Sequence, residues 1–159
     1  MIFVTVGSML PFDRFIKAMD DWTGRHGEEE VFAQIGQGSY EPRHMRFERM
    51  LSPSQFKNFV LTSDLVVAHG GMGSVIMAAE AGKPILLFPR RASLGEHTTE
   101  HQLHTVNWLK ERPGIHVVLD EAELDARIEA AQAMSLDGAT LGTVAPAPFV
   151  ERLRQAILD

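Results

Sequence analysis

An apolar run that ends in glycines and then enters a helix constrains this fold more than any other feature of the sequence. Residues 64–68 read Asp-Leu-Val-Val-Ala, and residues 69–74 read His-Gly-Gly-Met-Gly-Ser. The run does not alternate in polarity, which is typical of a strand buried on both faces of a parallel sheet. Glycines let a ligand approach the backbone, and free N–H groups at a helix start favour phosphate. The segment predicts a strand, a turn and a helix, and the turn either holds an anion or holds no ligand.

Strand and helix patterns alternate along the rest of the chain. Strands are expected at residues 2–6, 31–35, 45–50, 64–68, 84–88 and 115–119, and helices at 12–22, from 53 onward, at 73–81, 97–111 and 121–133. Ser52 and Pro53 are expected to begin the short second helix, and Gly82 to close the third. This alternation predicts an α/β fold, a single Rossmann-like domain with a mostly parallel sheet. Ligands bind beyond the carboxyl ends of the strands in such sheets.

The length and composition suggest one main domain with a short C-terminal addition. The 159 residues suit one core, and residues 1–134 carry the strand and helix patterns. Residues 135–148 are rich in Gly, Ala, Thr and Pro and are expected to be a linker. Residues 149–159 have the spacing of an amphipathic helix. That helix is expected to pack on its own domain or to dock on a partner.

Composition also limits the classes of function. The chain has no cysteine, which excludes disulfides and thiolate chemistry and fits a reducing cytoplasm. The net charge of −6 argues against broad binding to nucleic acid or to an anionic membrane face. Neither a signal peptide nor a membrane-spanning run is visible. Any anion site must therefore be local.

The glycine segment does not fit two common nucleotide motifs. The P-loop pattern G-x-x-x-x-G-K-[ST] is absent. A dinucleotide fingerprint that begins at Gly71 would need its third glycine at Ile76, and no acidic residue ends the following strand, where Arg90 and Arg91 stand instead. His69 and Ser74 nevertheless add a ring nitrogen and a hydroxyl that can bond phosphate oxygens.

Several segments in order resemble the C-terminal half of family 28 glycosyltransferases. They are His-Gly-Gly-Met-Gly-Ser at 69–74, Ala-Gly-Lys-Pro at 81–84, Phe-Pro-Arg-Arg at 88–91 and Glu-His-Gln at 100–102, with Val-Thr-Val-Gly-Ser at 4–8 and Gln-Ile-Gly at 34–36. The nearest likeness is to stand-alone bacterial exopolysaccharide subunits. These are similar to the soluble subunit of the eukaryotic two-part transferase that adds the second N-acetylglucosamine to a dolichol-linked sugar.

This resemblance implies the donor-binding half of a GT-B fold. The chain would hold a UDP-sugar in the cytoplasm, and a separate membrane-attached subunit would bind a polyprenyl-linked acceptor and recruit the chain to the inner face of the membrane. Transfer would invert the anomeric centre and need no metal or other cofactor. Glucuronic acid is one candidate sugar, and neutral hexoses are others.

The resemblance also implies roles for particular residues. The diphosphate would be held by Gly7, Ser8, Gly70, Gly71, Met72, Gly73 and Ser74. His69 would lie close to it as a catalytic residue that helps to stabilise the charge on the leaving diphosphate. The sugar and nucleoside would meet Gln34, Gly36, Arg90, Arg91, Glu96, His97, Glu100, His101 and Gln102. One position departs from the family, because Met77 stands where many relatives carry a ribose-binding Glu, and Glu80 lies a turn later.

Three points stay open at this stage. Asp13, at the start of a helix, is either an N-cap or a catalytic base, and in a split enzyme the base can come from the partner. Arg90 and Arg91 either meet phosphate or a uronate carboxylate, or they are solvated or contact a partner. Besides a transferase, the chain can be a nucleotide-sugar-binding protein without catalysis.

A zinc site is a further alternative. His97, Glu100 and His101 spell H-x-x-E-H, and within one helix both histidines would share a face. Such a site needs a third protein ligand and a peptidase cleft, which a short α/β chain hardly supplies. Without zinc, Glu100 and Gln102 are expected to serve a sugar.

Overall fold

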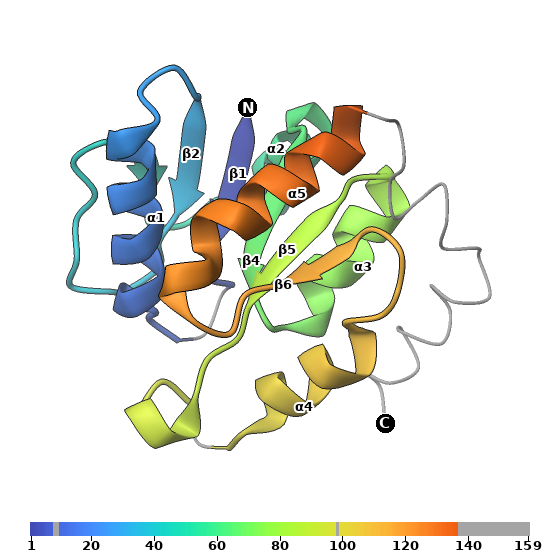
Figure 1. Cartoon of the computed structure of the whole chain (residues 1–159). Helices are drawn as coiled ribbons and strands as arrows, with labels where there is room; N and C mark the ends of the chain where they lie inside the picture. Colours follow the sequence, from blue (N-terminus) through green and yellow to red (C-terminus); the bar gives the residue numbers. More distant parts are fainter. Residues whose placement is uncertain (8–9, 98, 137–159) are drawn as a thin grey trace.

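A computed structural model gives the fold of residues 1–7, 10–97 and 99–136 (Figure 1). The strands are β1 (Ile2–Thr5), β2 (Val31–Gln34), β3 (Arg46–Glu48), β4 (Leu65–His69), β5 (Ile85–Phe88) and β6 (Ile115–Val117). The helices are α1 (Asp13–Arg25), α2 (Pro53–Thr62), α3 (Met72–Ala81), α4 (His101–Leu109) and α5 (Leu124–Leu136), with short 3-10 turns η1 (Ala92–Leu94) and η2 (Glu121–Glu123). None of the described helices is long and apolar enough to cross a membrane.

The six strands form one parallel sheet in the order β3-β2-β1-β4-β5-β6. The chain begins in the middle of the sheet, runs to one edge, and then returns to build the other half. The predicted α/β fold with a Rossmann-like sheet is therefore confirmed. Strand order reverses between β1 and β4, and the carboxyl ends of these two strands are where such sheets bind ligands.

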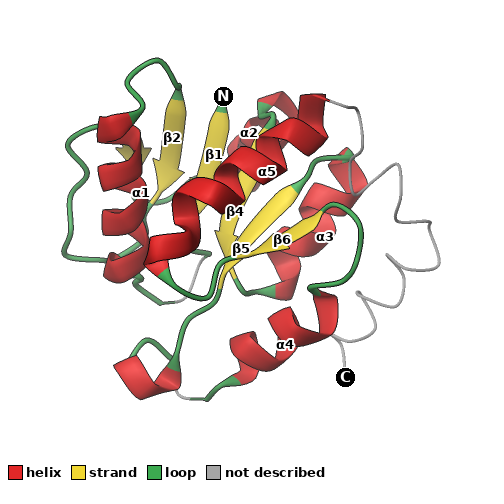
Figure 2. Ribbon diagram, viewed as in Figure 1, coloured by secondary structure: helices red, strands yellow, loops and turns green. Residues whose placement is uncertain are grey.

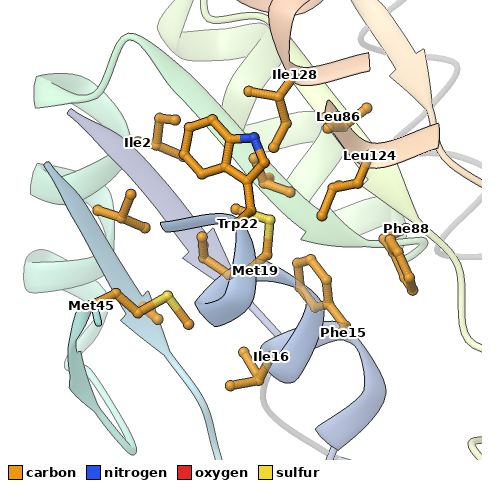
Figure 3. Packing of buried hydrophobic residues seen from close by; sticks show 14 of the residues in the cluster. Ile2, Phe15, Ile16, Met19, Trp22, Met45, Leu86, Phe88, Leu124 and Ile128 are labelled. Atoms are coloured by element: carbon orange, nitrogen blue, oxygen red, sulfur yellow. The ribbon is translucent and has the colours of Figure 1, made fainter. Parts of the chain in front are cut away.

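Helices cover both faces of the sheet (Figure 2). On one face α1 and α5 pack against alternate strand residues, and Trp22 and Met19 of α1 lie among Ile2, Leu86 and Ile128 (Figure 3). On the other face α2, α3 and α4 enclose a second core around Phe3. Each large side chain buried in this way contributes roughly 1.5–3 kcal/mol. The two cores hold the strand ends in fixed positions.

Local sequence signals set several helix ends as predicted. Ser52 caps α2 through a capping box with Gln55, and Pro53 follows at the first helical position. Gly82 ends α3 with a φ of 68°, in the left-handed region that favours glycine. The helix α1 begins at Asp13, but its N-cap is Phe12, so the cap role considered for Asp13 is wrong. The Asp13 carboxylate instead accepts hydrogen bonds from loop N–H groups at Ser39 and Tyr40.

Two predicted boundaries differ from the structure. The helix expected at 97–111 begins only at His101, because the hydroxyl of Thr99 accepts the His101 N–H and the Thr99 N–H goes to the His97 ring. Such local side-chain bonds compete with a helical turn. The helix expected at 121–133 opens as a 3-10 turn and then runs to Leu136, two residues into the predicted linker. The remainder of that linker and the predicted helix 149–159 lie outside the described residues.

Candidate functional site

A cavity of about 530 Å³ opens at the carboxyl ends of the central strands. Its walls come from the ends of β2 and β4 and the loops after β1, β3 and β5, together with residues of α2, α3 and α4. Several sequence-predicted residues line it: Gly7, Gln34, His69, Gly73, Ser74, Arg90, His97 and Gln102. Other predicted residues lie outside the lining: Asp13, Gly36, Gly70, Gly71, Met72, Arg91, Glu96, Glu100 and His101. Ser8 is not among the described residues.

The glycines of the turn between β4 and α3 have different tasks. A Cβ at Gly73 would meet nothing within 4 Å, so the backbone there faces open space in the cavity. A Cβ at Gly71 or Gly7 would run into the His69 ring, and one at Gly70 would press on Gln102, Pro89 and Val106. Gly73 therefore leaves room for a ligand, whereas the others make room for side chains of the protein.

The start of α3 offers free backbone donors to this space. Its N-cap is Gly71, which has no side chain to cap the first N–H groups. Ser74 sits in the first turn, is 7% exposed and lines the cavity with Gly73. Unsatisfied N–H groups and the helix dipole together favour an anion at this position.

A hydrogen-bonded network stands beside the helix start. The side-chain oxygen of Gln102 accepts the backbone N–H groups of Gly70 at 3.2 Å and Arg90 at 2.9 Å. The Gln102 amide nitrogen and the Arg90 guanidinium each lie 3.0 Å from Nδ1 of His69. Burial, followed by the charge of Arg90, lowers the pKa of His69 to about 3. His69 is therefore neutral at physiological pH.

Arg90 is a buried cation that ties two loops together. It is 2% exposed, and its Nη2 donates to the carbonyl oxygens of Val6 at 2.7 Å and Leu10 at 2.5 Å. Its guanidinium also lies over the Phe12 ring. Burial lowers its pKa to about 10, which leaves it charged at neutral pH. Its Nε is buried without a hydrogen-bond partner among the described residues. The solvated pair considered for Arg90 and Arg91 is thus wrong for Arg90.

Gln34 lines the cavity but is held by its own neighbours. Its oxygen accepts the Thr5 hydroxyl at 2.6 Å, and its nitrogen donates to the Arg49 carbonyl at 2.9 Å. The Thr5 oxygen in turn accepts the N–H of Gly7. Gly36 takes a φ of 64° in the turn after β2. These residues shape the loops around the cavity.

Three predicted sugar-binding residues are bonded elsewhere in the chain. Glu96 makes a two-point ion pair with Arg14, at 2.7 and 2.9 Å, and accepts the backbone N–H of Arg91. The Arg91 side chain donates to the Leu119 carbonyl, and Glu100 accepts the N–H of Ser93. In this structure these bonds order the loop that carries η1.

The zinc alternative requires His97 and His101 on one helix, and this is wrong because α4 begins at His101. His97 lies in the preceding loop and lines the cavity, whereas His101 is exposed. Within the described ranges, no group of three or more His, Cys, Asp or Glu residues is placed to hold a metal ion.

Sequence reasoning missed most of the apolar part of the lining and singled out only Met77, as the position where many relatives carry a ribose-binding Glu. Met50, Leu51, Phe56 and Met77 line the cavity, as do Val6 and Leu10. Met77 lies one helical turn after Gly73 and Ser74 and so shares their face of α3. Met50 and Leu51 come from the connection between β3 and α2 and Phe56 from α2, where no motif marks them, and Val6 and Leu10 come from the connection after β1.

The described lining has no carboxylate, whereas it contains Arg90, two histidines, two amides and the Ser74 hydroxyl. The protein as a whole has a net charge of −6. A local excess of positive charge and hydrogen-bond donors on an acidic protein favours an anionic ligand at this place. One end of such a ligand would meet donors, and another part would meet apolar side chains.

Comparison with known proteins agrees with this geometry. Residues 1–156 match the family model described as glycosyltransferase family 28 C-terminal domain. No curated protein sequence matches the chain.

Solved structures share the fold at low sequence identity. ALG13, known from an NMR solution structure, has a TM-score of 0.62 at 16% identity over 96% of this chain and 93% of its own. MurG of Acinetobacter baumannii has a TM-score of 0.63 at 14% identity, over 98% of this chain and 49% of its own. The glycotransferase of kitacinnamycin has a TM-score of 0.60 at 16% identity, over 97% of this chain and 37% of its own. The chain spans 37% of that enzyme and 42% of SnogD from Streptomyces nogalater, so it is much shorter than these two relatives.

Proposed function

Because the chain belongs to the glycosyltransferase family 28 C-terminal domain family, we propose that it is the donor-binding subunit of a two-part inverting glycosyltransferase. Its single α/β domain has the fold of the C-terminal, Rossmann-like half of a GT-B enzyme. The donor is a UDP-sugar, and the acceptor is a polyprenyl-linked saccharide in exopolysaccharide synthesis. A membrane-attached partner binds the acceptor and brings this chain to the inner face of the membrane.

The observation that carries the proposal is the cavity at the start of α3. The diphosphate lies against the N–H groups near Gly73 and the Ser74 hydroxyl, with His69 beside it. The nucleoside lies toward the apolar side chains of Leu51, Phe56 and Met77. No metal is needed, because helix N–H groups and the Arg90 charge offset the negative charge of the diphosphate.

The chemistry is a direct displacement. The acceptor hydroxyl oxygen attacks the anomeric carbon while the bond from that carbon to the diphosphate oxygen breaks, and UDP leaves. The hydroxyl proton goes to a base. Hydrogen bonds from the start of α3 stabilise the charge that develops on the leaving diphosphate.

The cavity does not itself supply that base among its described lining residues. It has no carboxylate, Nδ1 of His69 already accepts hydrogen bonds, and Nδ1 of His97 accepts the Thr99 N–H. Asp13 lies outside the lining and its carboxylate faces the Ser39–Tyr40 backbone. We therefore expect the partner to supply the base, and Asp13→Asn to leave turnover of the assembled enzyme within about twofold of wild type.

A separate donor half is part of this proposal. Of the solved structures that share the fold, ALG13 is covered to 93% by this chain and MurG to 49%. A chain with only the donor half binds the nucleotide sugar and turns over poorly alone. A nucleotide-sugar-binding protein without catalysis is the remaining alternative, and no turnover with any acceptor-binding partner would favour it.

The sugar is proposed to be glucuronic acid, with neutral hexoses as the competing class. Arg90 supports an acidic sugar, because its buried charge has no ion-pair partner and its Nε has no hydrogen-bond acceptor among the described residues. A uronate carboxylate or the diphosphate itself can supply the opposite charge.

Calorimetric titration of the purified chain with UDP, UDP-glucose, UDP-glucuronate and NADH, without added metal, tests the proposal. We expect saturable binding of UDP and its sugars, none of NADH, and tighter binding of UDP-glucuronate than of UDP-glucose. Gly73→Asp should abolish binding, because it places a carboxylate in the open space at the helix start without a steric clash. Gly27→Asp, at an exposed glycine with equally open surroundings, is the matched control. Loss of UDP binding in that control, or no UDP binding by wild type, would contradict the proposal.

A further inference from the structure

We propose that Gln102 is a positioning residue that holds His69 in the tautomer with its proton on Nε2, which makes His69 an uncharged hydrogen-bond donor to the anionic ligand. This deepens the proposed function, since the ligand is the diphosphate of the donor. It gives Gln102 a different task from the sugar contact that the sequence suggested.

The orientation of the Gln102 amide follows from two backbone donors. The N–H groups of Gly70 and Arg90 both point at the same Gln102 side-chain oxygen, at 3.2 and 2.9 Å. A backbone N–H can only donate, so the atom that faces them must be the carbonyl oxygen. The amide NH₂ of Gln102 therefore faces His69, and it donates to Nδ1 at 3.0 Å.

A second donor points at the same ring nitrogen. Nη1 of Arg90 lies 3.0 Å from Nδ1 of His69, and a guanidinium has no acceptor. With two donors directed at it, Nδ1 must present its lone pair. In a neutral imidazole the proton is then on Nε2. The ring itself is held between Gly7 and Gly71, since a Cβ at either glycine would collide with it.

The surroundings of His69 also oppose a second proton on the ring. The charged or titratable groups that face it are Arg90 and His97, and the described cavity lining has no carboxylate. The nearest acid to Arg90, Glu96, is engaged by Arg14. A proton on Nδ1 would meet two donors and add a cation beside Arg90. His69 thus donates from Nε2 without carrying charge.

This arrangement suits a leaving diphosphate. A neutral donor fixed before the ligand arrives stabilises negative charge as it develops, with no reorganisation of its own. It also keeps its protonation state across the physiological range, so binding does not depend on a histidine titration. A histidine free to titrate near its ordinary pKa would make donor binding strongly pH-dependent.

The first test reads the tautomer directly in the wild-type chain without nucleotide. Long-range ¹H–¹⁵N NMR spectra of the histidine rings should show His69 as the Nε2–H tautomer from pH 5 to pH 9, with no titration. The Nδ1–H tautomer, or a titration near pH 6.5, would overturn the inference. The proposed function is judged separately, by whether the wild-type chain binds a UDP-sugar.

The second test reverses the polarity of the bond with Gln102→Glu. The carboxylate still accepts from Gly70 and Arg90, but toward His69 it can only accept, so it draws a proton onto Nδ1. The His69 ring should then titrate above pH 6. Binding of UDP-glucose should weaken at least tenfold at pH 8 and recover in part below pH 6, whereas the wild-type affinity should change less than threefold. Gln37→Glu makes the same charge change at an exposed position outside the cavity lining and should behave as wild type. An unchanged His69 ring in Gln102→Glu would contradict the positioning role.

Discussion

Two walls of the same cavity are built in opposite ways. The polar wall, formed by His69, Arg90, His97 and Gln102 from β4, the end of β5 and α4, is tied by hydrogen bonds to the backbone of several loops. The apolar wall is formed by Met50 and Leu51 from the connection between β3 and α2, Phe56 from α2 and Met77 from α3, and has no comparable hydrogen-bond network among the described residues. Two of its members are methionines, which fill space flexibly.

This difference indicates that the two walls suit different parts of a nucleotide-sugar ligand. The polar wall is rigid before a ligand arrives, because Gln102 and Arg90 each hold more than one loop. It suits the diphosphate of the proposed UDP-sugar. The apolar wall excludes water and adapts to shape, which suits a nucleoside. Substitutions in the polar wall should therefore cost more than substitutions in the apolar wall.

The largest effect is expected from Arg90→Met. It leaves the carbonyl oxygens of Val6 and Leu10 without their buried donor, and removes the donor to His69. The free energy of unfolding should fall by about 3 kcal/mol, since losing one partner of a buried charged network is expensive. UDP affinity should drop by about a hundredfold, measured by calorimetry beside denaturant unfolding. Arg91→Met, which removes one exposed bond to Leu119, is the control and should stay within about 0.5 kcal/mol. Equal losses of stability and affinity in both variants would show that the buried hydrogen bonds of Arg90 matter no more than the exposed one of Arg91.

The polar wall also illustrates what the sequence can predict. The glycine segment predicted the strand, turn and helix, and the spacing around it predicted that His69, Gly73 and Ser74 share one site. The hydrogen-bond partners of these residues could not be predicted from the sequence, because Gln102 meets His69 only after α4 folds over the strand ends. The family resemblance suggested a sugar or nucleoside contact for both Gln102 and Glu96, whereas tertiary packing bonds both to the protein.

The fold was easier to predict than the site for a physical reason. Buried parallel strands carry apolar runs that are visible locally, so all six strands were found. The start of α4 was misplaced because the side-chain bonds of Thr99 stop the helix, and periodicity does not report them. Met50 and Leu51 of the apolar wall were missed because they lie in a connection with no motif.

A pH-dependent effect should follow from the polar wall. In the unfolded chain His69 takes up a proton below pH 6.5, but its pKa in the folded protein is lowered to about 3, so the unfolded state binds more protons between these values. Stability should therefore fall as pH falls from 6.5 toward 3, by up to about 1.4 kcal/mol per pH unit from this residue. At pH 5 the loss should be about 2 kcal/mol.

Urea unfolding from pH 7 to pH 5 measures this slope. His69→Asn should flatten it, because asparagine takes up no proton in the unfolded chain. Burial also lowers the pKa of His116, which lies at the edge strand β6 away from the cavity, so His116→Asn gives the matched comparison. If His116→Asn reduces the slope of stability against pH more than His69→Asn does, the acid sensitivity lies outside the polar wall.

Ser74→Ala should have a smaller effect, confined to binding. The Ser74 hydroxyl has no hydrogen-bond partner among the described residues and lines the cavity beside Gly73, so the fold does not depend on it. Loss of one hydrogen bond to a charged group should weaken UDP binding about tenfold, near 1.5 kcal/mol. Ser93→Ala, at an exposed position outside the cavity lining, should leave affinity unchanged. A large loss of stability in Ser74→Ala would show that the hydroxyl serves the fold instead.

The smallest effect is expected at the apolar wall, from the 2′-hydroxyl of the nucleoside. Met77 lies on α3 one turn beyond Ser74 and lines the cavity, on the side where the proposed binding mode puts the nucleoside. A thioether offers the ribose no strong hydrogen bond. UDP and 2′-deoxy-UDP should therefore bind within about threefold of each other, as compared by calorimetry in one buffer, since only about 0.6 kcal/mol separates them.

Met77→Glu sharpens this last comparison, because a carboxylate at that position can accept hydrogen bonds from ribose hydroxyls. It should introduce a preference for UDP over 2′-deoxy-UDP of about tenfold, as expected for one hydrogen bond to a charged group. Met77→Leu keeps the wall apolar and should leave the ratio near one. A strong preference for UDP in the wild-type chain would mean that other cavity groups hold the 2′-hydroxyl. The apolar wall would then be more than an adaptable surface, and the division between the two walls would lie elsewhere.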